Sequence, residues 1–148
     1  MTKRLILAAL SGSIVQFLLG WLIYGLLLAN FMSTQMTHFE GLMKDMNTWT
    51  FMLLTFFSGL AMSFLIAFIF QRWAKFDRFV KGMTAGMIFG GLVTLSFDLY
   101  SLGAMNMMTV AAAVVDVITS IITTGIVGGV IACVLGYKLE KKAEQPAA

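Results

Sequence analysis

The chain has 148 residues, of which 59% are hydrophobic and 11% charged, and its mean hydropathy is +0.91. Soluble domains are typically about 25% charged, and a soluble domain of this length would not bury so much apolar surface. The composition therefore excludes a soluble enzyme and a disordered protein, and it predicts one integral membrane domain over residues 1–148. The net charge of +3 gives no reason to expect a nucleic acid as a partner.

Four apolar runs free of Lys and Arg are long enough to cross a lipid bilayer as helices. They cover residues 5–29, 49–71, 82–102 and 110–137. A membrane-spanning helix needs about 17–20 such residues, and the runs lack the alternation that is typical of a barrel strand. We therefore predict an all-α bundle of four transmembrane helices, followed by a disordered tail over residues 139–148.

The Lys and Arg residues predict the orientation of these spans. Nine of the ten flank the spans on one side, and the exception is Lys44 between the first and second spans. The nine are Lys3, Arg4, Arg72, Lys75, Arg78, Lys81, Lys138, Lys141 and Lys142. Because positive residues concentrate on the cytoplasmic side of membrane proteins, both termini are expected to be cytoplasmic, an N-in and C-in arrangement.

The outer connection between the first and second spans carries a heptad pattern. Apolar residues recur there at intervals of 4, 3, 4 and 3, at Met32, Met36, Phe39, Met43 and Met46. Residues at this spacing share one helix face, so we predict a short amphipathic helix on the outer membrane surface. A soft-metal site on the outer face remains an alternative, because thioethers suit such metals and His38 lies in the same connection.

Small residues recur at intervals of four in the third and fourth spans. They are Gly82, Gly86 and Gly90 in the third span and Gly125 and Gly129 in the fourth. Small residues let helices approach closely in lipid, so these positions are predicted to pack helices together. The fourth span carries polar residues on the opposite face. It is therefore expected either to lie centrally in the bundle or to contact a second copy or a partner membrane subunit.

Two carboxylates, Asp98 and Asp116, interrupt the apolar runs. Ionisable residues inside a span are rare and often mark the path of an ion or a proton. The four runs contain no Lys, Arg or His to neutralise them, and an unpaired buried charge is unfavourable. Each carboxylate is therefore expected to be protonated or to bind a cation. A structural role remains open for both, with Asp98 reaching interfacial water and Asp116 held by neighbouring hydroxyl groups.

Other polar residues are expected to line an outward-facing cup together with these carboxylates. They are Gln16, Tyr24, Asn106, Thr119, Ser120 and Thr123. Thr119, Ser120 and Thr123 share one face of the fourth span with Asp116. No cofactor or metal is expected beyond the outer soft-metal alternative, because a single Cys and a single His provide neither a disulfide nor two imidazole ligands.

Two short stretches resemble known membrane proteins. Residues 20–25 resemble the opening glycine and tyrosine pattern of small bacterial membrane protein families of unknown function, and residues 97–102 with 115–117 are similar to a paired-aspartate hairpin in related families. The resemblance implies a four-helix protein of the bacterial cytoplasmic (inner) membrane and carries no activity. The expected function is non-enzymatic binding or transport of a small solute or ion. The alternative is an accessory subunit that docks through its small-residue faces.

Overall fold

The computed structural model describes residues 2–37, 48–74, 76 and 78–143. In chain order its elements are α1 (Thr2–Gly20), η1 (Trp21–Leu27), α2 (Ala29–Gln35), α3 (Trp49–Ile69), η2 (Phe70–Ala74), α4 (Phe79–Ala104) and α5 (Val110–Ala143). The two η segments are π-helical and directly continue α1 and α3. The described part of the chain is thus all-helical apart from its connections.

Four stretches are long and apolar enough to cross a membrane, which confirms the four predicted spans. They are Lys3–Leu27, Trp49–Ala74, Phe79–Ala104 and Val110–Tyr137. Large apolar side chains such as Leu27, Leu54 and Ile88 are exposed along their sides. Apolar surface of this extent would be unfavourable in water, and in a multi-pass membrane protein it faces the lipid.

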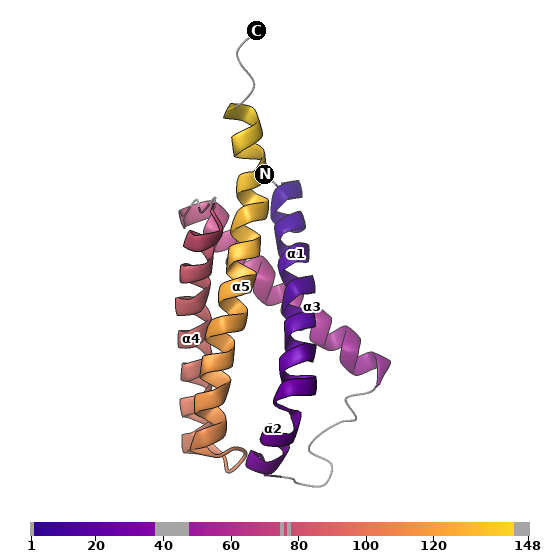
Figure 1. Cartoon of the computed structure of the whole chain (residues 1–148), viewed down its shortest axis with the longest axis vertical. Helices are drawn as coiled ribbons and strands as arrows, with labels where there is room; N and C mark the ends of the chain where they lie inside the picture. The colour runs from indigo at the N-terminus through magenta and orange to yellow at the C-terminus, as the bar shows by residue number, and fades with distance from the viewer. Residues whose placement is uncertain (1, 38–47, 75, 77, 144–148) are drawn as a thin grey trace.

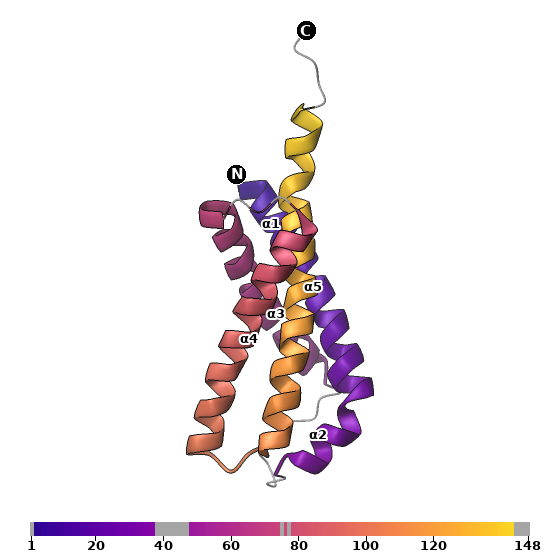
Figure 2. The ribbon, with the colours of Figure 1, turned by 60° about the vertical axis from the view of Figure 1, so that its left-hand side comes forward.

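Helix α5 lies at the centre of the bundle and contacts α1, α3 and α4 (Figure 1). The N-terminus, the connection from α3 to α4 and the last turns of α5 lie at one end. Helix α2 and residues 105–109, which connect α4 to α5, lie at the other end, which we call the α2 end (Figure 2). The central position of α5 agrees with the first of the two predicted alternatives, because its non-lipid faces are covered within one chain.

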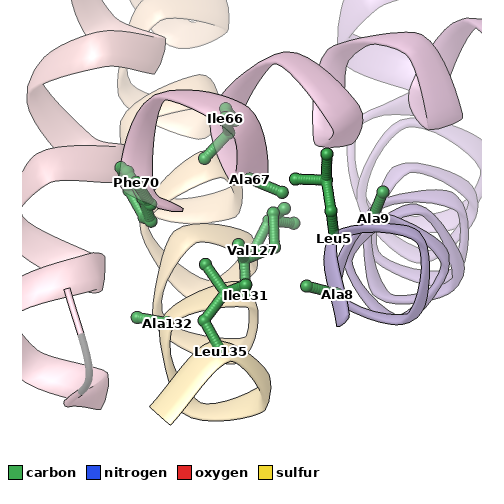
Figure 3. Packing of buried hydrophobic residues seen from close by; sticks show 10 residues of the cluster. All are labelled: Leu5, Ala8, Ala9, Ile66, Ala67, Phe70, Val127, Ile131, Ala132 and Leu135. Atoms are coloured by element: carbon green, nitrogen blue, oxygen red, sulfur yellow. The ribbon is translucent and has the colours of Figure 1, made fainter. Parts of the chain in front are cut away.

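A hydrophobic core joins α1, α3 and α5 in the half of the bundle away from the α2 end (Figure 3). Its residues are Leu5, Ala8, Ala9, Ile66, Ala67, Phe70, Val127, Ile131, Ala132 and Leu135. Gly12 allows Ile131 to approach α1, because a Cβ at position 12 would lie 2.8 Å from the Ile131 side chain. This core anchors one half of the bundle and leaves the α2 half more open.

The predicted small-residue positions of α4 and α5 meet along one seam between these two helices. A Cβ on Gly82 or Gly86 would lie closer than 3.0 Å to the backbone carbonyl oxygen of Gly128 or Thr124. A Cβ on Gly90 would lie as close to the Thr124 side chain. The side chains of Met87 and Phe79 pack against Gly125 and Gly129, respectively. The seam therefore fixes α4 against α5 by contact between their backbones.

The first half of α3 diverges from the other helices (Figure 1). Residues 49–55 are all exposed, whereas Ser63, Ile66 and Ala67 near the other end of the helix are buried. The divergence leaves α1, α4 and α5 as the helices that surround the polar residues of the α2 half.

The predicted outer helix is described only in its first turns. Helix α2 contains Met32 and ends at Gln35, and Met36 has an extended backbone with φ −99° and ψ 142°. Phe39, Met43, Met46 and His38 lie outside the described residues. At the other end of the chain, α5 continues through Ala143 into the predicted tail, and residues 144–148 also lie outside the described part.

Candidate functional site

The first span changes from an α-helix to a π-helix at Trp21. The Leu28 amide donates to the Ile23 carbonyl oxygen at 2.7 Å, a bond to the fifth preceding residue. The π geometry is rare and frequently occurs at functional sites. It also rotates the following side chains relative to those of a continuous α-helix, and Tyr24 lies within the altered segment.

Tyr24 connects this π-helix to α5. Its hydroxyl group donates a hydrogen bond of 2.5 Å to Oδ1 of Asp116. Ser120, one turn further along α5, also interacts with the Tyr24 hydroxyl. The Asp116 carboxyl group is therefore held between two helices by a neutral donor.

Asp98 reaches the same place from α4. The seam pairs Gly82 with Gly128 and Gly91 with Ile121, so the antiparallel register brings Asp98 opposite residues 112–114, within one turn of Asp116. Its side chain is only 2% exposed, and it interacts electrostatically with Asp116 and Tyr24. Its Oδ2 atom is buried and has no hydrogen-bond partner among the described residues. We call Tyr24, Asp98, Asp116 and Ser120 the acid cluster.

The acid cluster places two carboxyl groups together in a part of the chain without cations. The spans 5–29, 82–102 and 110–137, which supply its members, contain no Lys, Arg or His. Two adjacent carboxylates cannot both stay ionised in a low-dielectric interior without compensation. A proton or a small cation bound between them would lower this repulsion. The arrangement is therefore chemically suited to hold one positive charge.

Several predicted site residues lie outside the cluster. The Gln16 side chain packs on Gly59, and its Oε1 accepts a hydrogen bond of 3.4 Å from the Ser63 hydroxyl group, so it belongs to the α1–α3 interface. The Thr123 hydroxyl donates to the Thr119 carbonyl oxygen of its own helix at 2.9 Å. Thr119 is buried on α5, and Asn106 is exposed in the connection from α4 to α5.

Hydrogen bonds that the sequence did not predict join residues 35–37 to residues 107–109 at the α2 end. The Thr37 amide donates to Met107 at 2.9 Å, and the Thr109 amide donates to Gln35 at 3.1 Å. The Thr109 hydroxyl also donates to Oε1 of Gln35 at 2.7 Å. We call residues 35–37 with 107–109 the clasp. A threonine directly before an apolar run is a recognisable N-cap signal, and Thr109 indeed accepts from the Ala112 amide, but no local signal indicates the pairing with Gln35.

An apolar groove of about 490 Å³ lies between α1 and α3. Its lining consists of Ile6, Ala9, Leu10, Phe57, Leu60, Ala61 and Phe64. The groove contains no member of the acid cluster, so it is not the polar cup that the sequence predicts.

No protein-family model, curated protein or solved structure matches the chain. The function is therefore inferred from the geometry of the acid cluster alone.

The Tyr24→Phe variant is expected to lose about 1–3 kcal/mol of stability, because it leaves a half-buried carboxyl oxygen of Asp116 without its donor. Reversible unfolding in bicelles measures this loss. Tyr100→Phe is the matched control, since Tyr100 is exposed on α4, and it should change stability by less than about 0.5 kcal/mol. A double-mutant cycle with Asp116→Ala, which removes the acceptor, should show coupling, and additive effects would mean that the hydrogen bond does not contribute.

Proposed function

We propose that the protein binds a proton or a small cation at the acid cluster and moves it across a bacterial inner membrane. The observation that carries this proposal is the buried Oδ2 atom of Asp98, which has no hydrogen-bond partner within the described ranges while its carboxyl group interacts electrostatically with that of Asp116. A purely structural carboxyl group is expected to have its oxygen atoms satisfied by donors. A buried carboxyl oxygen without a donor is better explained by reversible binding of a proton or a cation.

The proposed orientation places the α2 end outside the cell. The basic residues Lys3, Arg4, Arg72, Arg78 and Lys81 flank the spans at the opposite end of the bundle (Figure 1). Their concentration supports a cytoplasmic location for that end and for both termini. The acid cluster then lies in the outer half of the membrane, and α2, which contains the first residue of the proposed amphipathic outer helix, lies at the outer end.

The chemistry of the pair supports exchange of one positive charge for another. With a proton or cation bound, the pair carries less uncompensated charge and is compatible with the surrounding lipid. Release of the occupant leaves two negative charges together, which favours prompt uptake of the next cation. The four hydroxyl and carboxyl side chains of the cluster offer only oxygen ligands, which suit protons and hard cations.

Proteoliposomes that contain a pH-sensitive dye test this proposal. A membrane potential that is negative inside should acidify the lumen faster in vesicles with protein than in empty vesicles. The same measurement with a dye for sodium or for potassium in the lumen, and that ion outside, identifies the cation. Fluxes equal to those of empty vesicles for all three ions would contradict the proposal.

The accessory alternative has less support in this fold. The seam glycines that would dock a partner already contact the neighbouring helix within the chain. Helix α5, whose two faces suggested a homo-oligomer, is covered by α1, α3 and α4.

One observation favours a second candidate, the soft-metal site on the outer face. An antiparallel bridge pairs Met36 with Met108, and side chains on such a pair are adjacent. Silver ion, a redox-stable substitute for Cu(I), should therefore bind to the purified protein. The Met36→Leu/Met108→Leu variant should weaken this binding by about tenfold, or about 1.4 kcal/mol. Unchanged binding in titration calorimetry would remove this candidate.

A further inference from the structure

The acid cluster lies directly beneath the clasp. Asp98 is six residues from the end of α4 at Ala104, and Asp116 is six residues from the start of α5 at Val110. At a rise of 1.5 Å per residue, each carboxyl group is about 9 Å along its helix from the clasp. A water-filled route that runs from the α2 end along α4 and α5 to the cluster would therefore pass the segment that the clasp holds.

That segment, residues 21–37, is weakly anchored. Neither η1 nor α2 contains a buried residue. The helical path bends at Leu28, with φ −103° and ψ −1°, where η1 ends and α2 begins. Segments with few buried apolar contacts open at low free energy. The polar attachments of this segment include the Tyr24–Asp116 hydrogen bond and the clasp, and water can replace both.

We propose that residues 21–37 form a gate over the acid cluster, and the structure shows this segment with the clasp formed. The proposal rests on the proposed function and adds the control of access to the same site. Because Tyr24 donates to Asp116, a cation that approaches Asp116 competes with the Tyr24 hydroxyl group. Occupation of the site then releases the Tyr24–Asp116 attachment, which couples binding to opening at the bend of Leu28.

A disulfide across the clasp tests the gate. Met36 and Met108 form a bridge flanked by the two backbone bonds, a non-hydrogen-bonded pair with Cα atoms about 4.5 Å apart. This separation is within the range of disulfides. The Met36→Cys/Met108→Cys variant, made with Cys133→Ser to remove the native exposed thiol, should therefore lock the clasp.

The readout is the rate at which a cationic methanethiosulfonate reagent modifies a Ser120→Cys reporter in nanodiscs, measured by mass spectrometry. Locking should slow modification by about tenfold or more relative to the reporter in the Cys133→Ser background. Gln35→Ala, which removes the side-chain bond to Thr109, should accelerate it. Asn106→Cys, exposed at the same end, controls for access of the reagent and should react equally fast in both forms.

Equal reporter rates in locked and unlocked protein, with normal labelling of Asn106→Cys, would overturn the gate. If the Ser120→Cys protein does not fold, modification of Asp98 and Asp116 by a water-soluble carbodiimide gives the same comparison without that cysteine. Labelling reports access and not transport. A lock that slows labelling in a protein without cation flux would therefore support the gate and contradict the proposed function.

Discussion

The Asp116→Asn variant is expected to lose the proposed cation flux while keeping its fold. Asparagine has the size of aspartate, and its Oδ1 atom can still accept the hydrogen bond that Tyr24 donates. It carries no negative charge and cannot exchange a proton at this position. Flux into proteoliposomes should therefore fall by about tenfold or more at equal protein content, equivalent to at least about 1.4 kcal/mol in the barrier.

Asp98→Asn separates the functional role from a structural one. Because the Asp98 carboxyl group is buried, interacts with the carboxyl group of Asp116 and lies in a span without Lys, Arg or His, its neutral replacement should leave stability unchanged or raise it. The flux should nevertheless fall as strongly as in Asp116→Asn. Reversible unfolding and flux measured on the same preparation test both statements.

Ser96→Ala is the matched control, since Ser96 is exposed on the same helix, two residues from Asp98. It should keep wild-type flux and stability. If Asp116→Asn keeps wild-type flux, the carboxyl groups act as packing groups and the proposed function is wrong. If only Asp98→Asn keeps it, the cation is held by Asp116 with Tyr24 and Ser120.

Hydropathy predicted the four spans because a chain in lipid must satisfy its backbone within each segment, which leaves helices as the direct solution for runs of this length. The glycine spacing predicted close packing because small residues let helices approach each other in lipid. It did not identify the partner helix. The structure shows that Gly82, Gly86 and Gly90 all face α5, the helix joined to α4 by the short connection 105–109.

The acid cluster was predictable in part. Asp98 and Asp116 stand out because the surrounding runs carry no other charge, and Tyr24 is placed near them by depth. Depth read from a sequence does not give the direction in which a side chain points relative to other helices. Gln16 is therefore at a suitable depth yet contacts Ser63 of α3. The π-helix that positions Tyr24 and the clasp between Gln35 and Thr109 depend on contacts between distant segments.

The Gly86→Ala variant is expected to destabilise the bundle by about 1–3 kcal/mol, the usual effect of overpacking. The added methyl group would meet the carbonyl oxygen and carbon of Thr124. These are backbone atoms of α5, so no side chain can rotate away and the two helices must separate. Reversible unfolding in bicelles measures the loss, and Gly82→Ala should behave alike, since its methyl group would meet the Gly128 carbonyl oxygen.

Gly103→Ala, on the same helix, is a control that should raise the stability of the bundle, whereas Gly86→Ala should lower it. No atom lies within 4 Å of a Cβ at position 103, so the substitution should only improve helix propensity, by about 0.5–1 kcal/mol. Equal destabilisation by Gly103→Ala and Gly86→Ala would mean that the seam does not set the spacing of α4 and α5. Because the same seam brings Asp98 to Asp116, separation of the helices at Gly86 should also lower the flux, whereas Gly103→Ala should leave it unchanged.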